Sequence, residues 1–249
     1  MALNKDSKVY TLAIALAICL AGSVLVSTAA VVLKPRQQAN QAQDRQVNIL
    51  KVAGLYEPGI DVGAVFEARV EPKVIEFATG EEAADIDPVS FDPAKYETSL
   101  SSAEDIAGIN SMPRYGLVYL VRDEAGEVSR YVLPVHGYGL WSTMYAFLAL
   151  EADGNTVSSI SYYQHAETPG LGGEVENPRW TSQWTGKEIY DDAGKVVFSL
   201  VKGGAGAGNE HGVDALAGAT LTSNGVTNTI RFWLSDAGYK PFLEKATRS

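Results

Sequence analysis

The chain contains a run of small residues and hydroxyl side chains at Asp214-Ala215-Leu216-Ala217-Gly218-Ala219-Thr220-Leu221-Thr222-Ser223-Asn224. The run leads into the most regular helical pattern of the sequence, residues 222–237. Four apolar residues there recur at i, i+4, i+7 and i+8: Val226, Ile230, Trp233 and Leu234. Gly238 and Pro241 follow, as is usual beyond the end of a helix. The pattern predicts a helix whose first turn is rich in hydroxyl groups.

The start of this helix has the chemistry of an anion site. Helix N-termini present unpaired N–H groups and a partial positive charge, which favours phosphate. Gly218 and Ala219 let a ligand approach the backbone, and Thr220, Thr222 and Ser223 can cap the helix or bond a phosphate. A capped helix with a tight entry turn explains the same residues, so from this run alone both interpretations stay open.

Outside this run, the apolar residues of the chain are concentrated near its start. Of 249 residues 46% are hydrophobic, and Val9–Leu33 contains no charged side chain. A helix of this length spans about 37 Å, enough for a hydrocarbon core of about 30 Å. A cleaved signal peptide ending near Ala29 is the alternative, but the run continues to Lys34, which favours a retained transmembrane helix over residues 9–33.

Three further divisions precede the domain that carries the run. Residues 1–8 form a short N-terminal segment, and residues 34–56 form either a helical stalk or a solvated linker. Residues 57–112 form an acidic accessory region, because Glu57–Asp105 alone holds thirteen Asp and Glu against three Lys and Arg. Positive charges flank both ends of the apolar run, so charge does not fix its orientation.

The remainder, residues 113–249, is predicted to be an α+β domain with an antiparallel sheet and flanking helices. Two strand pairs are predicted at 115–122 with 127–133 and at 144–150 with 157–163, each joined by a turn signal. Further strands are predicted at 70–77 and 196–202, and a short helix at 178–185 with Trp180 and Trp184 on one face.

Composition excludes several functional classes. A formal net charge of −10 and a pI near 4.8 argue against nucleic acid as a partner. One cysteine and three histidines leave no disulfide framework and no metal site within this chain. The glycine run at 203–208 does not complete GxGxxG, and no P-loop, GxSxG or HExxH motif is present, so we expect neither a dinucleotide site nor a catalytic residue.

Residues 214–220 resemble the flavinylation motif Asp-x-x-Ser/Thr-Gly-Ala-Thr of the sodium-translocating NADH:quinone oxidoreductases and the related Rnf complexes. Ala217 departs from it, standing where the family usually has Ser or Thr. The segments 135–142, 167–172 and 220–226, the single apolar span and the length all look like the covalent FMN-binding subunit of the sodium pump, the NqrC family. The resemblance implies FMN attached to Thr220 through a phosphoester bond.

The resemblance also implies a cofactor site drawn from three segments. Besides Thr220, its members are Asp214, Gly218, Ala219, Thr222, Ser223, Glu167, Thr168, Leu171, Gly172, Tyr138 and Trp141. Glu167 and Thr168 are expected to hold polar atoms of the flavin, with Leu171 against its ring. Tyr138 and Trp141 pack near the isoalloxazine in this interpretation, and plain core aromatic residues are the alternative.

For function, the resemblance implies an electron carrier within a complex of six subunits that oxidises NADH, reduces ubiquinone and exports sodium ions. A separate flavin transferase using FAD and magnesium would load Thr220. The complex would lie in a bacterial inner membrane, in contact with its lipid, with the soluble domain in the periplasm and the N-terminus in the cytoplasm. Three alternatives stay open: the equivalent Rnf subunit, a membrane-anchored FMN-binding protein outside any redox pump, and a structural scaffold.

Overall fold

The computed structural model describes residues 7–248, so residues 1–6 of the predicted N-terminal segment lie outside the described residues. The chain divides into two compact units, residues 1–45 and 46–249. The first described element, α1 (Lys8–Val52), is a helix of 45 residues. It continues through the stretch after Lys34 for which the sequence left a stalk and a linker open, and Gln and Ala, both good helix formers, are frequent there.

The N-terminal part of α1 is long and apolar enough to cross a membrane. An 18-residue window of this helix has a mean hydropathy of 2.4, and none of that window is buried within the structure. The large apolar side chains that it exposes include Val9, Leu12, Leu16, Ile18, Leu25 and Val32. An exposed apolar helix of this length is stable where lipid, rather than water, surrounds it.

The second unit is built on one antiparallel sheet of five strands in the order β1-β4-β5-β6-β7. The bounds are Val70–Glu76 for β1, Tyr115–Arg122 for β4, Val128–Tyr138 for β5, Thr143–Glu151 for β6 and Val157–Gln164 for β7. Both predicted strand pairs are confirmed, and β5 extends five residues further than expected. Because β1 pairs with β4, the acidic stretch contributes an edge strand to this sheet.

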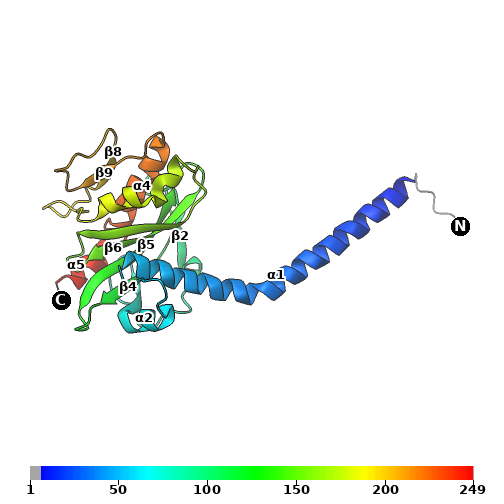
Figure 1. Cartoon of the computed structure of the whole chain (residues 1–249), viewed down its shortest axis with the longest axis horizontal. Helices are drawn as coiled ribbons and strands as arrows, with labels where there is room; N and C mark the ends of the chain where they lie inside the picture. The colour runs from blue at the N-terminus through cyan, green and yellow to red at the C-terminus, as the bar shows by residue number, and fades with distance from the viewer. Residues whose placement is uncertain (1–6, 249) are drawn as a thin grey trace. The chain divides into compact units, whose positions relative to one another are not determined.

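The two faces of the sheet bury different partners, since successive side chains of a strand point to opposite faces. Leu133 and Val135 belong to a core shared with helix α4 (Thr220–Trp233). Val132 lies on the other face, in a smaller core with Ile49 and Leu50 from the last turns of α1. Helix α2 (Val62–Arg69) adds partly buried apolar residues to this second core. Figure 1 shows these elements around the sheet.

The sheet opens between β4 and β5 where the chain beyond α4 enters it. The paired register of β4 and β5 ends at Tyr119↔Val132. Two residues further along β5, Pro134 has no N–H to donate to a neighbouring strand. The hydroxyl of Tyr239 lies there instead and donates its single proton to the carbonyl of Pro134 at 2.8 Å, with the carbonyl of Leu117 at 3.2 Å as a second, shared acceptor. Burial raises the pKa of Tyr239 well above its usual range, so the hydroxyl keeps its proton.

The remaining elements are short and surround the sheet. They are η1 (Pro93–Tyr96), β2 (Glu97–Ser99), β3 (Ser111–Pro113), η2 (Gly172–Glu176), α3 (Pro178–Thr181), η3 (Ser182–Trp184), β8 (Ser199–Val201), β9 (Gly212–Asp214) and α5 (Lys240–Ala246). Trp180 and Trp184 are both buried with ring centroids 5.5 Å apart, as predicted. The predicted strand at 196–202 is shorter, and α5 was not predicted. The architecture is α+β, as the sequence indicated.

Candidate functional site

The first turn of α4 presents one hydroxyl to the surface. The helix begins at Thr220, two residues earlier than the sequence pattern predicted, with Ala219 as its N-cap and no side-chain hydrogen bond at the cap. Gly218 has a φ of +71°, a left-handed conformation that glycine adopts without a steric penalty. Thr220 is exposed. Its hydroxyl therefore lies at a helix terminus that carries unpaired N–H groups and a partial positive charge.

The other two hydroxyls of this turn are buried and already have partners. Thr222 Oγ1 donates to Glu167 Oε2 at 2.6 Å. Ser223 Oγ donates to the carbonyl of Ala219 at 2.9 Å and accepts from the N–H of Leu216 at 3.0 Å. These two side chains thus fix the turn before the helix, and of the three hydroxyls only that of Thr220 is open to a partner in solution.

Asp214 lies at the end of β9, shortly before this turn in the chain. Its Oδ1 accepts from the N–H of Ala205 at 2.7 Å, and its carbonyl accepts from Trp180 Nε1 at 2.8 Å. The N–H of Asp214 in turn donates to Gln183 Oε1 at 3.1 Å. The residue therefore joins the glycine-rich loop and α3 to the segment that leads to Thr220.

Glu167 is the centre of a buried hydrogen-bond network that connects the three predicted segments. The residue is 5% exposed. Oε1 accepts from the N–H groups of Leu140, Trp141 and Ser142 at 3.0, 2.8 and 3.3 Å, and Oε2 accepts from Thr222. Burial alone would raise the pKa of Glu167. The hydrogen bonds from Thr222 and the backbone outweigh it and hold the pKa below its usual range.

Apolar side chains on the same three segments are exposed to solvent. Leu171 is 44% exposed, Trp141 65% and Leu221 59%. With Leu140, these residues form what we call the apolar rim. Leu171 also approaches the turn before α4, since a Cβ on Gly218 would lie 3.1 Å from Leu171 Cδ2. Exposed apolar side chains in this number at one place indicate a surface for another group.

Thr168 and Tyr138 are placed differently from the rest of the predicted set. The carbonyl of Thr168 accepts from the N–H groups of Leu171 and Gly173, at 3.1 and 2.9 Å, which closes the turn that carries the rim residue Leu171. Tyr138 is 47% exposed and lines a separate cavity of about 290 Å³ together with His136 and Tyr145. Trp141 is not among the residues that line this cavity.

Three contributors were not predicted, and all come from the loop after β5. Gly139, Leu140 and Ser142 surround the carboxylate of Glu167, and Ser142 Oγ accepts from the N–H of Ala166 at 2.7 Å. A sequence signal exists in the glycine spacing at 137 and 139, which marks a close approach of the backbone to another group.

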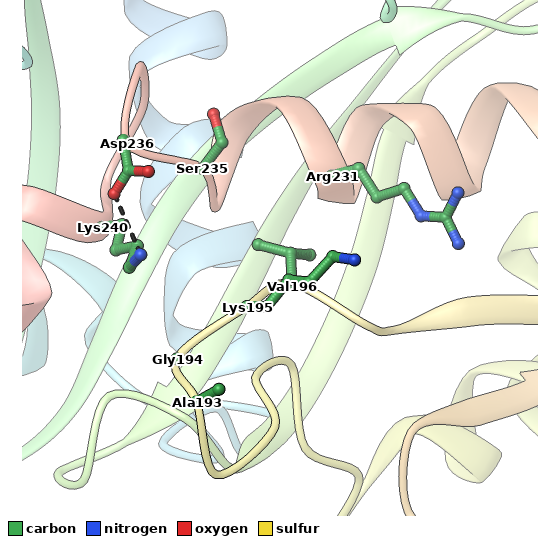
Figure 2. Close-up of a pocket in the computed structure, with 8 residues that line it drawn as sticks. All are labelled: Ala193, Gly194, Lys195, Val196, Arg231, Ser235, Asp236 and Lys240. Carbon is green, nitrogen blue, oxygen red and sulfur yellow. Dashed lines mark ion pairs between the residues drawn. The ribbon is translucent and has the colours of Figure 1, made fainter.

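A second cavity lies at the opposite end of α4. It measures about 370 Å³ and is lined by Ala193, Gly194, Lys195, Val196, Arg231, Ser235, Asp236 and Lys240. Figure 2 shows Lys240 directed at Asp236, whose Oδ1 lies 2.9 Å from Nζ. Since Arg231 follows Thr220 by eleven residues in α4, the two residues are about 16 Å apart along the helix axis. This cavity is therefore separate from the surroundings of Thr220.

Comparison with known proteins identifies the family. Residues 139–235 match the model of the FMN-binding domain, and this range includes Glu167, Thr220 and the apolar rim. The NqrC component of the Na(+)-translocating NADH-quinone reductase from Vibrio parahaemolyticus is 49% identical, over 98% of this chain and 97% of that protein. The chain belongs to the NqrC family. NqrC from Pseudomonas aeruginosa is 47% identical over 96% of both chains.

A solved structure of the same family has the same fold. The crystal structure of Shewanella oneidensis NqrC matches with a TM-score of 0.79 and 35% identity, over 85% of this chain and all of that one. The predicted resemblance to NqrC and the predicted fold class are thereby confirmed. As a member of this family, the chain is one subunit of an oxidoreductase complex that has other subunits.

Proposed function

We propose that Thr220 carries FMN through a phosphoester bond to its Oγ1. The observation that carries the proposal is the contrast within one helical turn. Of the three hydroxyls there, those of Thr222 and Ser223 are buried and hydrogen-bonded, whereas Thr220 is exposed beside free backbone N–H groups. A diester at this place would keep a negative phosphate at the positive end of α4.

The surroundings of Thr220 fit FMN. The flat aromatic ring of a flavin needs apolar side chains, and the apolar rim supplies Leu171, Trp141 and Leu221 in exposed positions. Gly218 leaves the backbone open beside the attachment residue, because it has no Cβ. In this site FMN supplies the redox chemistry, and the protein contributes binding, orientation and electrostatics. Thr220 acts as a tether, neither an acid nor a base.

Attachment requires a separate reaction that a flavin transferase performs with FAD and magnesium. Thr220 Oγ1 attacks the phosphorus of the FMN half of FAD and loses its proton to a base of the transferase. The bond between the two phosphates breaks, AMP leaves, and a new bond joins phosphorus to Oγ1. No electron is transferred in this step. The exposure of Thr220 is what lets a second enzyme reach it.

In the assembled complex we place this protein as an electron carrier between other redox centres. The relatives are named as Na(+)-translocating NADH-quinone reductase subunits, which supports a relay from NADH to ubiquinone coupled to sodium export. The NADH and quinone sites would belong to the other members of a complex of six subunits. The apolar helix α1 would anchor the chain in the lipid of a bacterial inner membrane, with the folded domain in the periplasm.

Intact-protein mass spectrometry tests the attachment. The full chain is expressed with and without the flavin transferase and denatured before the measurement. We expect the mass to increase by one FMN less one water only when the transferase is present, and peptide sequencing to place the increase on Thr220. Flavin that dissociates on denaturation, or a modified peptide without Thr220, contradicts the proposal.

A further inference from the structure

We propose that Glu167 is a positioning residue, which holds the surroundings of Thr220 in place before the cofactor is attached. The inference rests on the proposed role of Thr220 and adds a residue that acts on that site without touching the flavin. It replaces the expectation that this carboxylate binds polar atoms of the cofactor directly. Three properties of Glu167 support it: its partners, its packing and its charge.

Both oxygens of Glu167 accept hydrogen bonds within the protein. Oε1 accepts three backbone N–H groups, and Oε2 accepts the hydroxyl of Thr222 at 2.6 Å. An ionised carboxylate has about two acceptor positions on each oxygen, so the three N–H groups saturate Oε1. The position that remains on Oε2, beside the bond from Thr222, faces the backbone of Gly172.

The backbone packs closely against both oxygens of this carboxylate, which is 5% exposed. A Cβ on Gly139 would lie 2.6 Å from Oε1, and a Cβ on Gly172 would lie 2.6 Å from both Oε2 and Thr222 Oγ1. Two backbone segments therefore approach Glu167 as closely as glycine permits. We infer that the carboxylate holds these segments and not the cofactor.

The segments that Glu167 joins carry the groups proposed to meet the flavin. The loop after β5 supplies Leu140 and Trp141, the turn after β7 supplies Leu171, and the first turn of α4 supplies Thr220. Their partners lie 25 to 55 residues from Glu167 in the sequence. Long-range bonds of this kind fix three exposed segments that local structure alone would leave free to move.

The charge explains why a carboxylate, and not an amide, occupies this position. A carboxylate only accepts hydrogen bonds, and all four groups that face it are donors. The amide of a glutamine would turn its NH₂ group towards Thr222, whose hydroxyl would then have to accept in place of donating, and the negative charge that the three N–H groups face would be gone. Hydrogen bonds to an ionised group are also stronger than those to a neutral one.

The test uses the full chain in three variants beside the unmodified protein. Glu167→Gln keeps the shape and removes the charge, Thr222→Val removes only the bond to Oε2, and Glu124→Gln is the control at an exposed acidic residue of the β4–β5 turn. Hydrogen exchange of the amides of residues 140–142 is measured in flavin-free chains. The rate of covalent flavin loading by the transferase is measured separately, after circular dichroism has shown that each variant is folded.

We expect amide exchange at residues 140–142 to become at least ~10-fold faster in Glu167→Gln, with several-fold slower loading of Thr220. Thr222→Val should move both quantities in the same direction by less, and Glu124→Gln should move neither. If Glu167→Gln does not fold, the amide exchange and the loading rate of Thr222→Val test the positioning role by themselves.

Unchanged exchange, or faster exchange with an unchanged loading rate, overturns the positioning role while the attachment to Thr220 stands. An unmodified chain that takes no flavin at Thr220 refutes the attachment itself, and the positioning role with it.

Discussion

The two ends of helix α4 are built in opposite ways. At its C-terminal end, Trp233 is buried and its Nε1 donates to the carbonyl of His136 at 2.6 Å, while Tyr239 bridges the open part of the sheet. At its N-terminal end, Thr220 and Leu221 are exposed. One end closes the fold, and the other presents an exposed hydroxyl. The difference shows that a single amphipathic helix can be anchored at one terminus and exposed at the other.

The largest loss of stability should follow a substitution at the C-terminal end of α4. Trp233→Ala should destabilise the second unit by about 3–5 kcal/mol, because it leaves a cavity and an unpaired carbonyl on His136. The matched variant at the open end is Leu221→Ala, which should change the stability by less than about 0.5 kcal/mol since that side chain is 59% exposed. Urea unfolding measures both. Equal losses would show that the two ends do not differ as described.

A smaller loss of stability is expected when the hydrogen-bond network of Glu167, next to the N-terminal end of α4, is disrupted. The pKa of Glu167 is lower in the folded chain than its ordinary value of 4.5, so the unfolded chain binds its proton first on acidification. The stability that ionised Glu167 contributes is therefore complete above about pH 4.5 and is lost as the pH falls through the lowered value. Glu167→Gln should cost about 2–3 kcal/mol near neutral pH and less in acid. Urea unfolding at pH 7 and below pH 4 measures the difference, and a cost that does not shrink in acid would refute the assignment.

A weak effect is expected at Ala217, where the chain departs from the usual flavinylation motif. Ala217 is exposed, and Ala217→Ser adds one hydroxyl without entering the core. Stability should change by less than about 0.5 kcal/mol, and covalent flavin occupancy should stay equal or rise. Occupancy is measured from the ratio of flavin absorbance to protein absorbance after denaturation. A much lower occupancy would show that this position acts on the loading reaction in another way.

Local sequence patterns predicted most of the strands and helices of the second unit. Alternating and helical periodicities located the two hairpins and the apolar face of α4, because burial acts on each element separately. The start of α4 at Thr220 was placed two residues too late, since Thr and Ser suit both a cap and a first turn.

What the sequence did not predict depends on distant residues. The insertion of Tyr239 beside Pro134 joins residues 105 apart, and the bond from Thr222 to Glu167 joins residues 55 apart. No short-range pattern reports such contacts. The family resemblance therefore predicted Glu167 as a member of the site, but the sequence did not predict the hydrogen bonds that its carboxylate accepts.

The proposed function depends above all on the exposed Thr220 hydroxyl being the attachment point. Thr220→Val is compared with Thr98→Val, which makes the same change at an exposed residue of β2. Both full chains are co-expressed with the flavin transferase, denatured, separated by electrophoresis and examined for flavin fluorescence. We predict a fluorescent band for Thr98→Val and none for Thr220→Val, with both variants folded. A fluorescent band in Thr220→Val would contradict the attachment.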